Sequence, residues 1–186
     1  MNYFSANKTS KSLIEAVEAA MASPPVDHAG MLLRSMQRLL SDSFILYFQI
    51  HQSHWNVEGI DFPQFHGFFG DLYEEVYDKL DDIAEKIRTL GAYTPRTLGE
   101  LLSESSLHGI VAPPPAIGLA FAAPANPSTR EMVEMIRRQN QIVISDLSVA
   151  LMGAKELNNE GLQNFLQDMI DRHNKIEWKL TATLKG

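Results

Sequence analysis

Two histidines and two carboxylates in the first half of the chain have the residue types of a metal site. His54 and His66 are twelve residues apart, Asp81 follows fifteen residues after His66, and Glu85 comes four residues later. Side chains four residues apart share one face of a helix, so the two carboxylates can act together. Two imidazoles and two carboxylates suit a borderline divalent metal such as Fe(II) and leave coordination positions open for an oxidant.

The spacing also predicts where such a site must lie. On one continuous helix, His66 and Asp81 are about 22 Å apart along the axis, at about 1.5 Å per residue. Metal–ligand bonds are only about 2 Å long. If all four side chains bind together, the site must lie between two antiparallel chains, and a two-fold contact then makes two equivalent sites. From spacing alone, the alternative is an ordinary polar helix face.

Two long helices are predicted to carry these residues. Apolar side chains recur at helical spacing through residues 27–57, and Gly59 is expected to stop that helix. Pro63 is expected to open a second helix, which continues without interruption to Leu90. Because the connection between them is short, the two helices should be antiparallel, with His54 and His66 close to each other.

The second half of the chain predicts two more helices after an irregular stretch. Ser128 and Glu131 have the spacing of a capping box, so a third helix should start there and end near Gly153. A fourth is expected over residues 160–184. One short helix is expected within residues 97–107, and residues 108–126 form a long apolar loop, which we expect to pack on a neighbouring chain. The fold class is therefore an all-α four-helix bundle with a crossover between its second and third helices.

Composition limits the class of protein. The 186 residues carry 16 Lys and Arg against 23 Asp and Glu, a net charge of −7, and no cysteine. The lack of cysteine excludes disulfides, thiolate zinc sites and Fe–S clusters. No apolar run approaches the roughly 20 residues of a membrane helix. We expect a soluble cytoplasmic protein, with residues 1–25 as an extension bearing a short amphipathic helix and residues 26–186 as one domain.

Three runs of residues resemble the Dps family of mini-ferritins (DNA-binding proteins from starved cells). These runs are His54-Trp55-Asn56-Val57-x-Gly59, Phe62-x-x-x-His66 and Leu80-Asp81-x-x-Ala84-Glu85-x-Ile87-Arg88-x-Leu90-Gly91. The spacings between the two histidines, the aspartate and the glutamate all match that family's pattern. The likeness is close over most of residues 30–110 and looser over residues 128–186.

The resemblance implies a ferritin-like bundle that assembles into a hollow dodecamer. Such cages oxidise Fe(II) with hydrogen peroxide or oxygen, store the ferric product and protect against oxidative stress. By resemblance, His54, Asp81 and Glu85 hold the first iron, and Glu85 bridges to a second iron held by His66, at the two-fold contact. Trp55 matches a tryptophan that passes an electron or guards against radicals; the alternative is a packed aromatic side chain.

One position departs from the family pattern. The family has Asp or Glu four residues after the second histidine, and this chain has Gly70. Asp71 lies about 100° further around the helix and is no obvious replacement. Either a close neighbour requires the missing side chain, or water completes the second metal's shell. We expect a stronger first iron site, a weak second one, and reduced ferroxidase activity.

Two other functions remain open at this point. One is a nucleoid-associated, DNA-protecting cage whose ferroxidase site is weakened by Gly70. The other is a structural assembly that only keeps the fold. Few lysines lie near either end of this acidic chain, which disfavours direct DNA binding because phosphate contacts need clustered positive charge.

Overall fold

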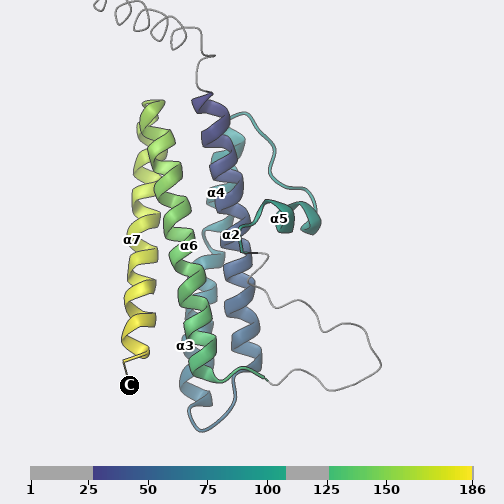
Figure 1. Cartoon of the computed structure of the whole chain (residues 1–186), viewed down its shortest axis with the longest axis vertical. Coiled ribbons are helices and arrows are strands. Elements are labelled where there is room, and N and C mark those ends of the chain that lie inside the picture. Colours follow the sequence, from purple (N-terminus) through teal and green to yellow (C-terminus); the bar gives the residue numbers. More distant parts are fainter. Residues whose placement is uncertain (1–26, 108–125, 186) are drawn as a thin grey trace, which may run out of the picture.

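Helices account for all the regular secondary structure in the described residues of this computed structural model, 27–107 and 126–185. The long helical rods run along the molecule's long axis (Figure 1), and they are α2 (His28–Asn56), α3 (Phe62–Tyr77) followed by α4 (Leu80–Thr89), α6 (Thr129–Glu156) and α7 (Glu160–Thr183). The short helix α5 (Leu98–Glu104) packs across the outside of α2. The predicted all-α bundle is confirmed. The helix expected within residues 1–25 and nearly all of the expected 108–126 loop lie outside the described residues.

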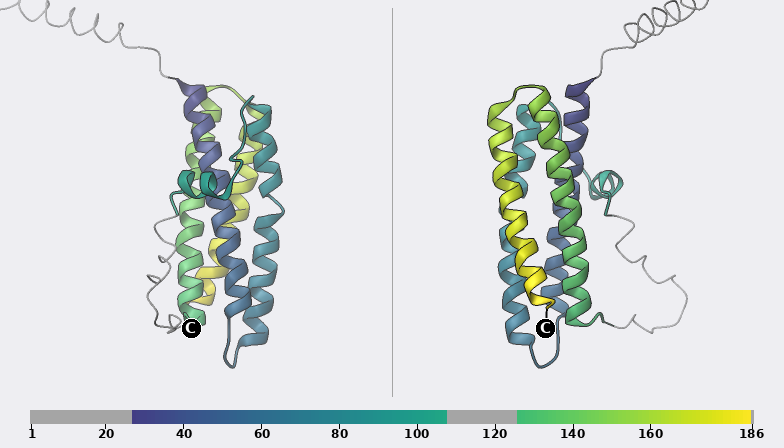
Figure 2. Two further views of the ribbon diagram at one scale, coloured as in Figure 1. Left: turned by 90° about the vertical axis from the view of Figure 1, so that its right-hand side faces the viewer. Right: turned by 60° about the vertical axis from the view of Figure 1, so that its left-hand side comes forward.

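The connections give the bundle its topology. A short loop joins α2 to α3, so these two helices are antiparallel, and α4 ends at the opposite end of the bundle from the start of α6 (Figures 1 and 2). The chain therefore has to cross the length of the bundle between its second and third rods. Helix α6 then packs against both α2 and α7, which confirms the predicted crossover.

Polar caps start the helices where the sequence predicts. The Ser128 side chain accepts a hydrogen bond from the Glu131 N–H, and the Glu131 carboxylate reaches back to the Ser128 N–H, which completes a capping box at the start of α6. The Asn159 side chain accepts from the Leu162 N–H at the start of α7. These side chains satisfy backbone donors that the first helical turn leaves without partners. In the α2–α3 loop, Gly59 has a φ of 105°, which a residue with a side chain rarely adopts.

The second rod is interrupted, contrary to the prediction of one continuous helix. Helix α3 ends at Tyr77, and the Lys79 N–H donates to the Val76 carbonyl, three residues back, at 3.2 Å. This tighter turn breaks the regular pattern before α4 resumes at Leu80. The two segments still follow each other along one side of the bundle (Figure 2), so the interruption does not fold the end of α4 back towards the start of α3.

Helix α6 also differs from the prediction, because it continues past Gly153 to Glu156. A Cβ atom added at Gly153 would lie 3.2 Å from the Leu32 Cβ, tighter than an ordinary contact. The glycine therefore lets α6 approach α2 closely instead of ending the helix.

One apolar core holds the rods together. Fully buried side chains from every long helix contribute to it, among them Met36, Leu39, Phe69, Ile83, Ile136, Val143, Leu166 and Ile176. Burying one such side chain is worth about 1.5–3 kcal/mol, so this core fixes the relative positions of the helices. Among the described helices, none combines the length and the apolar character that crossing a bilayer requires.

Candidate metal site

The two histidines of the predicted site meet at the end of the bundle where α2 joins α3. The rings of His54, near the end of α2, and His66, one turn into α3, stack with centroids 3.7 Å apart and planes 21° from parallel. His54 Nδ1 lies 2.7 Å from the His66 carbonyl oxygen, and His66 Nδ1 lies 2.9 Å from the His54 carbonyl oxygen. Each imidazole is therefore hydrogen-bonded to the backbone carbonyl of the other histidine. The short loop places this pair as the sequence predicts.

These reciprocal hydrogen bonds determine where each ring carries its proton. A carbonyl oxygen only accepts, so each Nδ1 must carry a hydrogen, and in the neutral form of either ring the lone pair is at Nε2. Metal-binding histidines usually have one ring nitrogen oriented by a carbonyl or carboxylate in this way. The arrangement of His54 and His66 therefore fits two oriented nitrogen ligands.

The two carboxylates of the predicted site are exposed on α4. Asp81 and Glu85 are four residues apart on this helix, and neither forms a hydrogen bond or ion pair with another part of the chain that the structure describes. Two nearby carboxylates are paired, Asp82 with Lys79 at 2.7 Å and Glu75 with Lys179 at 2.9 Å. Asp81 and Glu85 are thus free to take a cation, as are the exposed carboxylates of Asp71, Glu74 and Asp78 on the same rod.

The histidines and the carboxylates do not meet within one chain. Asp81 lies beside Tyr77 in an open hollow at the far end of α3, whereas His66 lies near the start of that helix. Within residues 27–107 and 126–185, no three His, Cys, Asp or Glu side chains are close enough to hold one metal ion. A site built from all four predicted ligands therefore needs a second chain.

Gly70 lies against the histidine pair. A Cβ atom added there would be 3.5 Å from both Cε1 and Nδ1 of His54, which is an ordinary van der Waals distance. Space for a side chain therefore exists at Cβ, so crowding by the neighbouring residues described here does not require the glycine. The structure leaves position 70 without the carboxylate expected from the family pattern.

Trp55 lies on the surface beside the histidines. Its side chain is 58% exposed, and its ring lies 4.2 Å from that of His51. His51 is half-buried and forms a 3.1 Å hydrogen bond with the Tyr47 hydroxyl. Burial lowers the pKa of His51, and the charge of His54 lowers it further. The Tyr47–His51 pair was not singled out from the sequence, although its four-residue spacing was there to be read.

His173 is a buried histidine with a different role. His173 on α7 lies between the helices, and its Nδ1 is 2.8 Å from the Asn140 side-chain oxygen. The Asn140 side-chain N–H donates in return to the His173 carbonyl at 3.0 Å. Burial lowers the pKa of His173 to about 4. This neutral ring joins α6 to α7 as part of the core.

The sequence reasoning also missed a buried acid at the middle of α2. Asp42 is fully buried, and it accepts hydrogen bonds from both the Ser105 and Ser106 hydroxyls, from the Ser106 N–H at 2.9 Å and from the Leu107 N–H at 3.3 Å. It therefore anchors the chain that follows α5 to the bundle. The sequence did contain a signal for this buried acid, because Asp42 lies between apolar positions of an amphipathic helix.

Asp146 on α6 completes this acidic pair. Burial raises its pKa to about 8, and the carboxylate of Asp42 raises it too, while Arg38 opposes the shift. Asp146 Oδ2 is buried and has no hydrogen-bond partner among the described residues. A protonated Asp146 can donate its hydrogen to Asp42, in keeping with the raised pKa.

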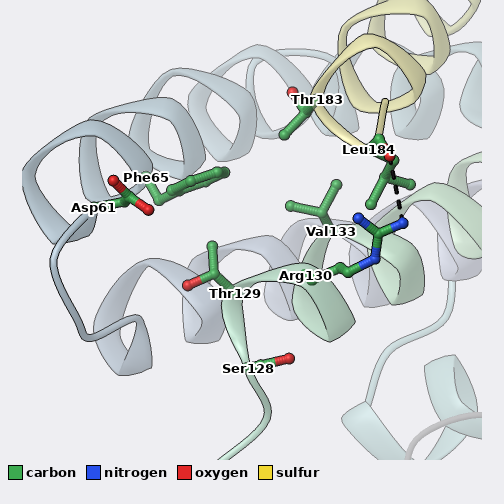
Figure 3. A pocket seen from close by; sticks show the side chains of 8 residues that line it. All are labelled: Asp61, Phe65, Ser128, Thr129, Arg130, Val133, Thr183 and Leu184. Carbon is green, nitrogen blue, oxygen red and sulfur yellow. Dashed lines mark hydrogen bonds between the residues drawn. The ribbon is translucent and has the colours of Figure 1, made fainter. Parts of the chain in front are cut away.

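A separate pocket opens at the end of the bundle where α3 and α6 begin (Figure 3). It has a volume of about 350 Å³ and is lined by Asp61, Phe65, Ser128, Thr129, Arg130, Val133, Thr183 and Leu184. The Arg130 guanidinium donates to the Leu184 carbonyl at 3.4 Å across it. With one carboxylate and one guanidinium, this lining does not favour a divalent cation.

The sequence and the fold of the chain match those of known proteins. A family model described as a ferritin-like domain matches residues 33–186. The DNA protection during starvation protein of Brevibacillus brevis is 27% identical over 150 residues, which cover 81% of this chain and 92% of that protein. The crystal structure of a Dps protein from Bacillus brevis aligns with a TM-score of 0.71 at 26% identity, over 87% of this chain and 100% of that one.

A second solved structure supports the fold alone. The Dps protein from Vibrio cholerae O1, described as a member of a broad superfamily of ferritin-like diiron-carboxylate proteins, aligns with a TM-score of 0.73 at 23% identity, over 85% of this chain and 91% of that one. The chain belongs to the ferritin-like family. Its relatives in sequence and structure include Dps proteins, which confirms the resemblance found in the three motifs.

Proposed function

We propose that the protein is a ferroxidase and iron-storage cage. It oxidises Fe(II) with hydrogen peroxide or oxygen, keeps the ferric product inside a homo-oligomer of the dodecameric Dps type, and so protects the cytoplasm against oxidative stress. The observation that carries this proposal is the histidine pair, in which each backbone carbonyl orients the other residue's ring and leaves its Nε2 lone pair for a metal.

Assembly supplies the missing half of the site. His66 lies near the start of α3 and Asp81 near the start of α4, so a second chain placed antiparallel across a two-fold axis would bring its carboxylates to the first chain's imidazoles. The unpaired state of Asp81 and Glu85 supports this arrangement, because two exposed carboxylates on one turn repel each other until a cation binds.

Each residue then has a role towards the substrate iron. His54, Asp81 and Glu85 bind the first Fe(II), and Glu85 reaches towards a second Fe(II) at His66. Trp55 lies next to this site and is accessible to an electron-transfer partner. One peroxide takes one electron from each of two Fe(II) ions and, with two protons, becomes two waters. Gly70 supplies no ligand, so the second iron binds more weakly than the first.

A paired substitution experiment tests the proposed activity. In Asp81→Ala, the rate of Fe(III) formation after mixing apoprotein with Fe(II) and peroxide should fall to the rate without protein. The matched control is Asp82→Ala, which removes the adjacent carboxylate that pairs with Lys79 on another face of α4. Equal rates in Asp81→Ala and the parent would reject the proposal.

Co-assembly tests the location between chains. A chain with both His54→Ala and His66→Ala keeps its carboxylates, and a chain with both Asp81→Ala and Glu85→Ala keeps its histidines. Each alone should be inactive. After the two are unfolded and refolded together, random two-fold pairing makes one complete site in each mixed pair, so about a quarter of the parental activity should return. No recovery in a mixture shown to contain mixed pairs would contradict a shared site.

A second candidate function is DNA protection, because the Brevibacillus brevis relative is named for it. The net charge of −7 opposes this function, since binding to phosphates depends on clustered Lys and Arg. A gel-shift titration at physiological salt tests it: retention of DNA there would support a nucleoid-associated cage, and retention only at low salt would count against it.

A further inference from the structure

Four side chains, three of them half-buried and one exposed, form a continuous run of rings between the histidine pair and the α4 carboxylates. We call this run the aromatic ladder, and its members are Tyr47, His51, Tyr73 and Tyr77. Tyr77 lies 5.2 Å from Tyr47 between ring centroids, and Tyr47 lies 6.3 Å from Tyr73. His51 stacks on Tyr73 at 4.1 Å, and Tyr73 meets His54 edge to face at 5.3 Å. These are contact distances for aromatic rings.

The ladder connects the two halves of the proposed site. At one end, Tyr73 touches His54, a member of the histidine pair. At the other end, Tyr77 lines the same hollow as Asp81. No apolar side chain has to be crossed between these ends, because each ring touches the next. An electron that leaves any ring of the ladder therefore has a path of short steps to the iron-binding residues.

The Tyr47–His51 hydrogen bond makes Tyr47 chemically different from the other tyrosines of the ladder. Loss of an electron from a tyrosine near neutral pH also requires loss of its phenolic proton, whose usual pKa is about 10. The Tyr47 hydroxyl lies 3.1 Å from His51 Nδ1. Among the described residues this contact is the only tyrosine hydroxyl placed against an imidazole nitrogen. His51 can accept the phenolic proton as the electron leaves.

We propose that Tyr47, with His51 as its proton acceptor, is a one-electron donor to the iron site. This inference rests on the proposed ferroxidase function. It follows from Gly70, because a site that binds one iron firmly supplies only one of the two electrons that peroxide needs. Tyr73 carries the second electron from Tyr47 to the site. Without that electron, one Fe(II) and one peroxide would release a hydroxyl radical.

The electrons and atoms balance in two steps. First, the O–O bond of peroxide breaks as Fe(II) and Tyr47 each give one electron. The phenolic proton passes through His51 to oxygen, and the products are Fe(III), hydroxide, water and a neutral Tyr47 radical. Second, another Fe(II) gives one electron to this radical, which takes back a proton. Tyr47 is restored, and two Fe(II) have been oxidised by one peroxide.

Tyr47→Phe is the direct test, because it keeps the ring and its contacts and removes only the hydroxyl. The matched control is Tyr93→Phe, since Tyr93 is exposed and lies under Arg88 and Arg96, apart from the ladder. Protein loaded with one Fe(II) per chain is mixed with peroxide and frozen for electron paramagnetic resonance, while a spin trap reports hydroxyl radical in a parallel sample.

The parent and Tyr93→Phe should show a tyrosyl radical signal and little trapped hydroxyl radical. Tyr47→Phe should lose the tyrosyl signal and trap several-fold more hydroxyl radical, and His51→Phe should do the same because the proton acceptor is gone. An unchanged tyrosyl signal in Tyr47→Phe would overturn the inference, and so would a loss of equal size in Tyr93→Phe.

An arm without iron separates this inference from the ferroxidase proposal. The apoprotein is oxidised by a flash-generated ruthenium(III) complex, and the tyrosyl radical is followed by its absorption. The radical yield should drop in Tyr47→Phe and stay at the parental level in Tyr93→Phe. An equal yield in the two variants would overturn the preference for Tyr47. Failure of Fe(III) formation in the parent would instead reject the ferroxidase proposal.

Discussion

Two pairs of carboxylates in this chain have opposite surroundings. Asp42 and Asp146 lie between α2 and α6, where one accepts several hydrogen bonds and the other has its pKa raised to about 8. Asp81 and Glu85 lie on the surface of α4, without a hydrogen bond or ion pair to any residue in the described ranges. Asp42 is satisfied by hydrogen bonds inside one chain and therefore contributes to folding. The second pair faces solvent, and in the proposed function its partners are a cation and a second chain.

The largest expected difference between the pairs is in stability. Asp42→Ala would remove the acceptor of the Ser106 N–H and an acceptor of the Ser105 and Ser106 hydroxyls, and we expect the free energy of unfolding to fall by about 3 kcal/mol. Asp81→Ala should change it by less than about 0.5 kcal/mol, because that side chain is exposed and unpaired. Denaturant unfolding followed by circular dichroism measures both. Equal losses in the two variants would contradict the contrast.

The next effect is a pH dependence that belongs to the buried pair. Because the pKa of Asp146 rises from 3.8 to about 8 on folding, the folded chain keeps a proton that the unfolded chain releases. The free energy of unfolding should therefore fall as pH rises from about 4 to about 8, and this contribution should be constant above that range. Asp146→Asn has no proton to lose and still donates to Asp42.

Unfolding curves of the parent and Asp146→Asn at several pH values in this window measure the effect. The decline should be smaller in Asp146→Asn, and the two proteins should be most alike at the acid end. Asp168→Asn is the matched control, because Asp168 is an exposed acid that pairs with Arg172 on α7. A decline as steep in Asp146→Asn as in the parent would assign the pH dependence to other groups.

A smaller effect concerns the iron bound at the histidine half of the candidate site. Gly70→Asp should raise the iron bound per chain from about one towards two, because a Cβ at this position makes only ordinary contacts with His54 and the carboxylate adds a ligand near His66. Anaerobic Fe(II) titration measures the number bound. Gly67→Asp is the control, since it adds a carboxylate to the same helix, also where a Cβ has space. Equal iron binding in both variants would show that position 70 contributes no ligand.

Much of the fold could be predicted because local signals agree with the tertiary packing. The capping box at Ser128 and the cap at Asn159 satisfy backbone donors within one helical turn, so their effect is visible in a few residues. The prediction of helix boundaries was wrong at two places, where contacts with distant residues or a local change of helical turn determine the boundary. Gly153 looked like a helix end, but it allows α6 to approach Leu32 on α2. The turn before Lys79 has neither proline nor glycine to announce it.

The candidate site divides in the same way. The spacing of His54, His66, Asp81 and Glu85 was enough to predict a metal site that one chain cannot complete, and this assignment stays a prediction. Which nitrogen of each imidazole carries the hydrogen could not be read from spacing, because it depends on carbonyls twelve residues away. The same holds for the Tyr73 ring that joins Tyr47 and His51 to His54.

For this protein, residue order alone settled the helical class, the helix starts and the identity of the candidate ligands, since helical periodicity and capping act over a few residues. Folding in three dimensions decided which groups are paired. It enclosed Asp42 with Asp146, left Asp81 in solvent, and turned His54 and His66 towards each other's carbonyls. Burial and hydrogen bonding depend on residues that are distant in the chain, and only the packed helices bring them together.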